Sequence, residues 1–166
     1  MLQDRGYSNI MSKGLTNVLI YSCLDVKKEL TLIFLSHEDR VGVKTLRTIK
    51  QDCETLNSSH FILLSHNGLT PFALRELNEC SGNADVEIFK KADLAFPIVR
   101  HILVPKHIAL SKEEKAELLE DLPSKALPKL KESDPVARYY HFPIGTVVKI
   151  HRQLGTNPEP YYRIVV

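Results

Sequence analysis

The sequence predicts an α/β protein, α+β over the whole chain, that consists of two small units. Apolar runs typical of strands alternate with stretches of helical periodicity up to about residue 92. The composition changes from polar to apolar near residues 90–93, and further helices and strands follow, ending in a strand pair. A length of 166 residues with 43% hydrophobic and 25% charged residues suits one domain or two small ones. We expect units at residues 1–92 and 93–166.

The first unit should begin with a hairpin. Residues 17–24 and 30–36 are nearly continuous apolar runs, and the polar residues 25–29 between them suit a turn. Because polar residues do not alternate with apolar ones, both strands are expected to be covered on both faces. A helix should follow Gly42, where apolar residues recur at three- and four-residue steps. These apolar residues are Val43, Leu46, Ile49, Cys53 and Leu56.

A third strand and a second helix complete this unit. Residues 60–65 are apolar, and the Asn-Gly pair at 67–68 tolerates positive φ at the exit of the strand. Thr70 can cap the next helix, and Pro71 fits its first position because the missing N–H is not needed there. The Ser-Gly pair at 81–82 should end this helix.

The second unit contains a capping box. Pro97 argues against a central strand at its start. Ser111 and Glu114 have the spacing at which each side chain bonds the other residue's backbone N–H, so a helix should follow. The prolines within residues 123–133 are expected to stop regular structure until Asp134.

The tail predicts a short helix and two strands. Asp134 can accept hydrogen bonds from the first N–H groups of a helix, with Pro135 in its first position. The β-branched run at residues 147–152 indicates a strand, and the turn-forming residues 155–158 indicate a reversal. Residues 161–166 then return as the partner strand.

Charge and hydropathy exclude several classes of protein. The formal net charge is only +2, so no overall basic field attracts the chain to nucleic acid. No apolar run reaches the roughly 18–20 residues that span a bilayer. Asp4 and Arg5 lie where a signal peptide would need an apolar core, so we expect a protein that stays inside the cell.

The sequence predicts no metal, cofactor or small-molecule substrate. Cys23, Cys53 and Cys80 are odd in number and widely spaced, and we interpret them as small buried hydrophobes. His101 and His107 could share a metal only if the chain between them folded back, so ordinary surface or core histidines are favoured. No Gly-rich phosphate loop, G-x-S-x-G elbow or paired acidic motif beside a strand is found.

Several motifs resemble one family. The tail reads D-P-V-A-R-Y at 134–139, G-T-V-V-K-I-H-R at 145–152 and Y-Y-R-I-V-V at 161–166. This order is similar to the signature of the fifth-subunit family of nuclear RNA polymerases, whose archaeal counterpart is the small H subunit. The similarity extends to D-R-G-Y at 4–7 and V-G-V-K-T at 41–45.

The resemblance implies a non-catalytic subunit of a nuclear DNA-directed RNA polymerase. It implies a nuclease-like α/β jaw domain at 1–92 and a small two-layer α/β assembly domain at 93–166. The expected partners are the largest subunit and other polymerase subunits, with downstream duplex DNA met only within the complex. The expected location is the nucleus.

The expected assembly interface lies in the tail, where arginine and tyrosine offer large contact areas. Its residues are Pro135, Arg138, Tyr139, Gly145, Lys149, Arg152, Tyr162 and Arg163. Tyr139 and Tyr162 could instead fill the core of their own domain, and the sequence leaves both interpretations open.

A second expected site is a DNA-facing loop at Asn67, Thr70 and Pro71. Here the chain departs from the family, because Phe72 stands where a serine is usual.

Two other functions are weighed against the subunit. A free nucleic-acid-binding module would use the basic residues of the tail with its tyrosines as stacking platforms, but the weak net charge counts against it. A nuclease would need converging carboxylates to hold a metal that activates water. The candidates for this role are Asp25, Glu29, Glu38 and Asp39.

Overall fold

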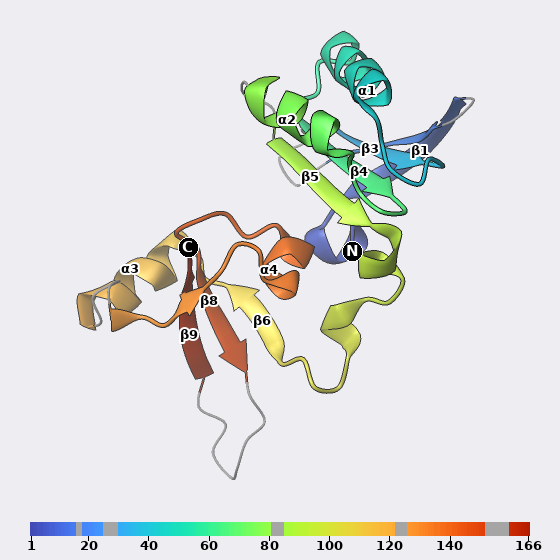
Figure 1. Cartoon of the computed structure of the whole chain (residues 1–166). Helices are drawn as coiled ribbons and strands as arrows, with labels where there is room; N and C mark the ends of the chain where they lie inside the picture. Colours follow the sequence, from blue (N-terminus) through green and yellow to red (C-terminus); the bar gives the residue numbers. More distant parts are fainter. Residues whose placement is uncertain (16–17, 25–29, 81–84, 122–125, 152–159) are drawn as a thin grey trace. The chain divides into compact units, whose positions relative to one another are not determined.

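The computed structural model divides into two compact units, Leu2–Phe96 and Pro97–Val166 (Figure 1). It describes residues 1–15, 18–24, 30–80, 85–121, 126–151 and 160–166. The division lies close to the boundary predicted between residues 92 and 93. In the described part of the chain, no helix has the length and apolar character needed to cross a membrane.

The N-terminal unit contains a five-stranded sheet whose strands follow chain order, β1-β2-β3-β4-β5. The strands are β1 (Ser8–Leu15), β2 (Val18–Leu24), β3 (Leu30–Ser36), β4 (His60–Ser65) and β5 (Asp85–Lys90). The first three pair antiparallel, which confirms the predicted β2–β3 hairpin. The last three run parallel, and the helices α1 (Val43–Thr55) and α2 (Pro71–Cys80) connect them. The sheet is therefore mixed.

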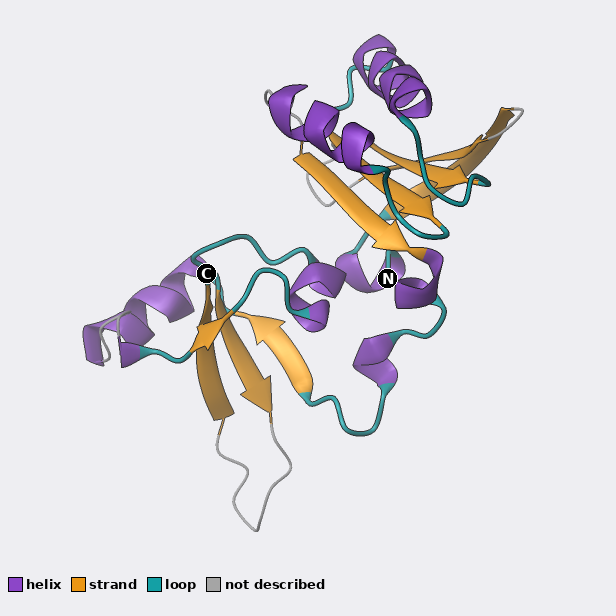
Figure 2. Ribbon diagram, viewed as in Figure 1, coloured by secondary structure: helices purple, strands orange, loops and turns teal. Residues whose placement is uncertain are grey.

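The core of this unit lies between the sheet and its two helices, which cover one face of the sheet (Figure 2). Phe34 of β3 meets Phe61 of β4 edge to face, with 6.0 Å between ring centroids. The predicted helix positions Leu46, Ile49 and Cys53 are buried against them. Each such apolar side chain contributes about 1.5–3 kcal/mol by burial.

Two parts of this unit differ from the expectation, and a third agrees with it. Leu56, expected on the buried face of α1, is 48% exposed because it is the C-cap, one residue beyond the last helical turn. Strand β1 was not predicted, since Ser, Asn, Lys and Gly interrupt its apolar residues. Strand β3 is buried at nearly every position, as predicted for a strand covered on both faces.

The C-terminal unit contains a four-stranded sheet of order β6-β8-β9-β7. Its strands are β6 (Lys106–Ala109), β7 (Lys129–Leu130), β8 (Val147–His151) and β9 (Pro160–Val165), and its helices are α3 (Lys112–Asp121) and α4 (Pro135–Tyr140). A short 3-10 helix, Ile98–Arg100, also belongs to this unit, whereas two others, Gln3–Arg5 and Lys91–Leu94, belong to the N-terminal unit. The predicted antiparallel pairing of the last two strands is confirmed.

Both helix caps that were predicted for the C-terminal unit are present. Ser111 N–H donates to Glu114 Oε2 at 2.8 Å, and Glu114 N–H donates to Ser111 Oγ at 3.2 Å. Asp134 Oδ1 accepts from Val136 N–H at 2.8 Å.

The expectation that regular structure stops until Asp134 is wrong, because Lys129–Leu130 form β7, parallel to β9. Two residues are too few to show a strand periodicity, so the neighbouring strand determines this one.

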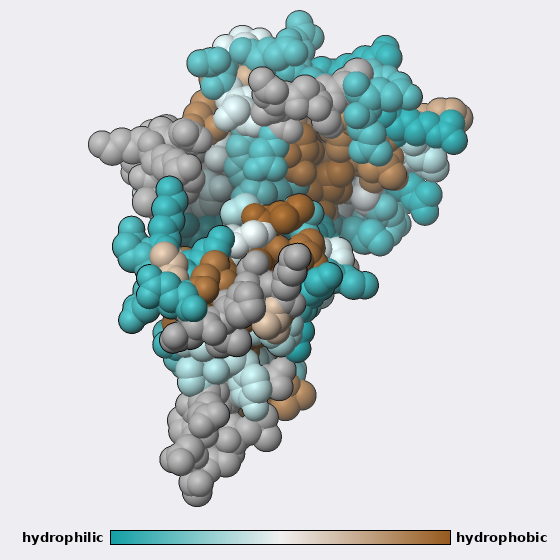
Figure 3. All heavy atoms as spheres, turned by 90° about the vertical axis from the view of Figure 1, so that its left-hand side faces the viewer, coloured by the Kyte–Doolittle hydropathy of each residue, from teal (hydrophilic) through white to brown (hydrophobic). Residues whose placement is uncertain are grey.

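The core of the C-terminal unit lies between the sheet and α4. Ala137 of α4 packs with Val148 and Ile150 of β8, Val165 of β9 and Leu130 of β7. This apolar cluster is small. On the face of the whole molecule drawn in Figure 3, hydrophobic residues form patches among hydrophilic ones.

The isolated C-terminal unit should fold, but marginally. A piece of this size buries a limited apolar area, so we expect an unfolding free energy of a few kcal/mol for residues 97–166. Circular dichroism of the fragment measures it. A cooperative melt above roughly 80 °C would contradict this expectation.

Replacing Asp134 by Ala should weaken the start of α4. Loss of the cap costs roughly 1 kcal/mol, whereas Asp134→Asn keeps an acceptor oxygen and serves as the control. Hydrogen exchange of residues 135–140 in the full chain measures the effect. Equal protection in the Ala variant and the wild type would show that this cap does not stabilise the helix.

Candidate functional site

Helix α4 presents the first three residues of the expected assembly interface. Pro135 is exposed at the first helical position, and Arg138 is half-buried. Tyr139 is only 2% exposed, and its ring meets that of Tyr140 edge to face at 5.4 Å. The structure therefore places Tyr139 in the interior, the alternative that the sequence had left open.

Gly145 has a geometric reason to be glycine. Its φ of 85° lies in the left-handed region that favours this residue. Its N–H donates to Val165 C=O at 2.9 Å, and its own C=O accepts from Lys115 Nζ at 2.9 Å. Gly145 thus links β9, α3 and the entry to β8.

Lys149 and Tyr162 come together on one face of the sheet. They are direct cross-strand partners of β8 and β9, so their side chains project from the same face. Both line a groove of about 330 Å³ beside α3. The remaining lining residues are Leu110, Glu114, Glu117 and Leu118. A lining that combines two leucines with charges of both signs suits a side chain of a protein partner.

Arg163 lies on the opposite face from Tyr162, because side chains alternate along a strand. Its Nη1 donates to Lys129 C=O at 3.3 Å. Arg152 lies outside the described residues. The structure thus brings Lys149 and Tyr162 together but divides the predicted interface between the two faces of the sheet.

The expected DNA-facing loop follows the end of β4. Asn67 is exposed and bonds Asp39 twice, from Nδ2 to Oδ1 and from N–H to C=O, each at 2.7 Å. Thr70 Oγ1 accepts from Ala73 N–H at 3.3 Å, as predicted for the cap of α2. Phe72, just beyond the exposed Pro71, is 72% exposed. This loop is well ordered by hydrogen bonds yet offers an aromatic ring to solvent.

The carboxylates weighed for a nuclease do not gather among the described residues. Glu38 Oε1 accepts from Thr45 Oγ1 at 2.7 Å, and Asp39 is held by Asn67. Asp25 and Glu29 lie outside the described residues.

A buried polar cluster that sequence reasoning missed lies on the sheet of the N-terminal unit. Arg5 bonds Glu87 through two parallel hydrogen bonds of 2.7 and 2.8 Å, and their side chains are 4% and 8% exposed. His60 Nε2 lies 3.0 Å from Glu87 Oε1, and His60 Nδ1 lies 3.2 Å from Thr31 Oγ1. Because Arg5 already neutralises Glu87, this cluster holds the N-terminal turn to β5 and leaves no carboxylate for catalysis.

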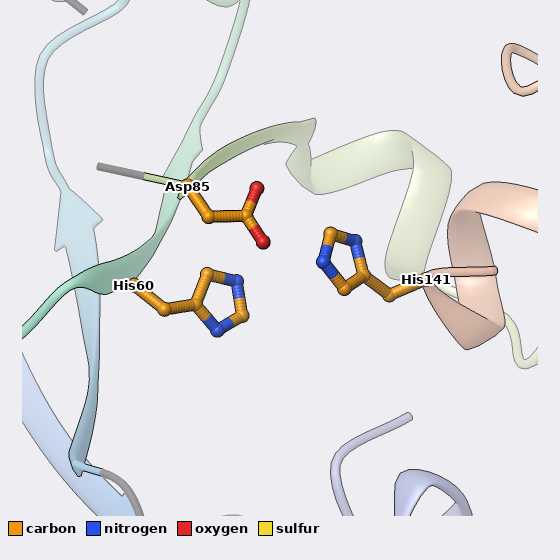
Figure 4. A group of neighbouring side chains, drawn as sticks. All are labelled: His60, Asp85 and His141. Atoms are coloured by element: carbon orange, nitrogen blue, oxygen red, sulfur yellow. The ribbon is translucent and has the colours of Figure 1, made fainter. Parts of the chain in front are cut away.

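Histidines occur in both units, and metal binding would need further ligands close to them. His60 and Asp85 are register partners on β4 and β5, and their side chains point the same way (Figure 4). His141, also labelled there, belongs to the other unit, and the positions of the two units relative to each other are not determined. His101 and His107 each bond nearby backbone, His101 accepting from Leu103 N–H and His107 Nδ1 lying 2.7 Å from Pro105 C=O.

Cys53 is an inert core residue, as predicted. Burial, with smaller contributions from the charges of Asp52 and Glu54, raises the pKa of its thiol to about 12. The thiolate that a nucleophile needs is therefore strongly disfavoured. The side chains of Cys23 and Cys80 lie outside the described part of the structure.

Residues 96–165 match the family model described as RNA polymerase Rpb5, C-terminal domain. The C-terminal unit is therefore similar to this family over nearly its whole length, in agreement with the resemblance predicted from the sequence.

Curated relatives extend the similarity to most of the chain. It is 36% identical over 137 residues to the DNA-directed RNA polymerases I, II, and III subunit RPABC1 of Caenorhabditis briggsae and, equally, of Caenorhabditis elegans. Each alignment covers 81% of this chain and 65% of the relative. The Dictyostelium discoideum subunit rpabc1 is 39% identical over 128 residues, 75% of this chain and 65% of that protein. The chain thus spans about two thirds of the length of these relatives.

Among solved structures, one described as "Structure of EndoMS in apo form" aligns with a TM-score of 0.42 and 17% identity. The alignment covers 51% of this chain and 38% of that chain. A likeness at this level supports no conclusion about fold or activity.

Breaking the Arg5–Glu87 pair should destabilise the N-terminal unit strongly. Arg5→Met leaves a buried carboxylate uncompensated, a change that typically costs about 3–5 kcal/mol. The matched control is Arg47→Met, because Arg47 pairs with Glu76 at 2.7 Å while its side chain is 68% exposed. Urea unfolding followed by hydrogen exchange of β4 and β5 measures both, and equal losses would contradict the structural role of the buried pair.

Proposed function

We propose that this chain is a non-catalytic subunit shared by nuclear DNA-directed RNA polymerases, located in the nucleus. One observation carries the proposal: the matched family domain, residues 96–165, coincides with the compact unit Pro97–Val166. A domain boundary set by family similarity and a unit set by packing thus agree. The names of the relatives, all polymerase subunits, support the same function.

The C-terminal unit is the assembly domain and docks on the largest subunit. The groove beside α3 supports this role, because Lys149 and Tyr162 are half-buried there and can bind an inserted side chain without a large entropy loss. Pro135 and Arg138 offer a second contact on α4, on the other face of the sheet.

The N-terminal unit is the jaw, with a nuclease-like α/β arrangement, and meets downstream duplex DNA only within the complex. The loop that carries Asn67, Thr70 and Pro71 is the part we assign to the DNA side. Its exposed Phe72 departs from the serine usual in the family, so this surface contacts the duplex through fewer polar groups.

A stand-alone nucleic-acid-binding module is disfavoured by the burial of its stacking platforms. Of the four tyrosines in the tail, only Tyr161 is well exposed, at 52%. Base stacking requires an open ring face, which the buried Tyr139 does not have. The net charge of +2 adds little phosphate attraction.

Purification of the tagged chain from its own cells tests the proposal. We expect the largest polymerase subunit to co-purify, as identified by mass spectrometry. The free chain, titrated with labelled duplex or single-stranded DNA at about 150 mM salt, should bind with a Kd of roughly 10⁻⁴ M or weaker. A sub-micromolar Kd that is lost on replacing Lys149 and Arg152 by Ala would overturn the proposal and favour the binding module.

A further inference from the structure

Two aliphatic side chains occupy the tip of a turn in the C-terminal unit. Val104 N–H donates to His101 C=O at 2.9 Å, which closes a four-residue turn with Ile102 and Leu103 at its centre. Their side chains are 95% and 82% exposed. Turn centres usually hold Gly, Pro, Asn, Asp or Ser, so aliphatic residues contribute nothing to the turn itself. Adjacent aliphatic side chains in water instead indicate a contact surface.

This turn leads directly into an edge strand. Strand β6 begins three residues after Leu103 and pairs with β8 on one side, while its other side borders no strand of the described residues (Figure 1). Leu110 N–H donates to Val147 C=O at 2.9 Å. Along an antiparallel strand, residues whose N–H and C=O bond the neighbouring strand alternate with residues whose N–H and C=O point away from it. Since Leu110 bonds β8, the backbone groups of Ile108 also face β8, and those of Ala109 point outward. An outward-facing edge is a template for a further strand.

Strands β6 and β8 themselves carry basic but no acidic residues, whereas Glu114 and Glu117 line the groove beside Lys149. Residues 97–110 and 143–151, which include β6 and β8, contain no Asp or Glu. Lys106 lies opposite His151 in the register, and Lys149 lies opposite Ile108, which is 38% exposed. A segment with carboxylates and aliphatic side chains would therefore complement the edge in both charge and hydropathy.

The same features argue against nucleic acid at this edge. Strand β6 carries no Phe, Tyr or Trp on which a base could stack, and the ring of its His107 is held 2.7 Å from Pro105 C=O. Exposed aliphatic side chains gain nothing from a phosphate backbone. Main-chain hydrogen bonds along a strand edge are instead the way in which extended peptides bind.

We propose that the outer edge of β6, with the Ile102–Leu103 turn, binds an extended acidic and aliphatic segment of another polymerase subunit. The segment adds to the four-stranded sheet as a further strand beside β6. The turn anchors its apolar residues, and Lys106 pairs with its carboxylates. This inference rests on the proposed function, because it names how a partner subunit engages the assembly domain.

Variants of the full tagged chain, purified from its own cells, test the proposal. The double variant Ile102→Ser with Leu103→Ser removes the apolar anchor without disturbing the core. Ala109→Pro removes the outward N–H, a change that an edge strand tolerates on its solvent side. Each should reduce the recovered polymerase subunits at least tenfold. The matched control, Leu56→Ser, changes a residue that is 48% exposed in the N-terminal unit and should leave recovery unchanged.

Folding and function are separated by two measurements. Hydrogen exchange of β8 must be unchanged in Ala109→Pro, which shows that the β6–β8 pairing persists. If the wild type recovers polymerase subunits and both variants recover them equally well, the edge proposal is overturned. If the wild type recovers none, the proposed function fails and this inference fails with it.

A photo-crosslinking amino acid at position 103 identifies the occupant. We expect an adduct, within the purified complex, to a polymerase-subunit peptide rich in Asp or Glu and aliphatic residues. An adduct to DNA, or to a basic peptide, would contradict the proposal. Lys106→Glu should weaken recovery as well, because it repels the carboxylates that the edge is argued to bind.

Discussion

The antiparallel pairing of β8 with β9 is the interaction on which the rest of the C-terminal unit depends. Strand β6 attaches only to β8 and β7 only to β9, so neither outer strand has a place without the central pair. The pair also brings Val148 and Val165 to the side where Ala137 packs, and Lys149 and Tyr162 to the other side. One strand pair therefore sets both the small core and the groove.

The N-terminal unit depends on a different kind of interaction. Its helices cover one face of the sheet with apolar contacts, while the buried Arg5–Glu87 pair ties the first turn of the chain to β5. A pair separated by 82 residues cannot form until the sheet has assembled. Such a pair adds little net stability compared with an apolar contact, but its two parallel hydrogen bonds fix the position of the N-terminal segment.

Elements with strong local signals could be predicted from the sequence, and those that depend on neighbours could not. The three- and four-residue steps between apolar residues such as Leu46 and Ile49 predicted α1. The capping box of Ser111 and Glu114 predicted the start of α3. Strand β7 could not be predicted, because β9 alone stabilises its two residues. For the candidate site, cross-strand pairing of Lys149 with Tyr162 needed the register, and the burial of Tyr139 needed the packing. The exposed turn at Ile102 and Leu103 was not predicted, because neither residue is one of the usual turn-forming types.

The small core and the open edge have a common physical origin. A sheet of four strands packed mainly against one short helix cannot bury every aliphatic residue of its own chain, so Ile102 and Leu103 remain in water. In a free protein such residues would favour aggregation, since an uncovered edge pairs with any available strand. On the proposed function, a partner subunit covers this edge and contributes the stability that the core lacks. The docking that we propose uses the apolar turn, the basic residues of β6 and β8, and the groove, all of which lie on this unit.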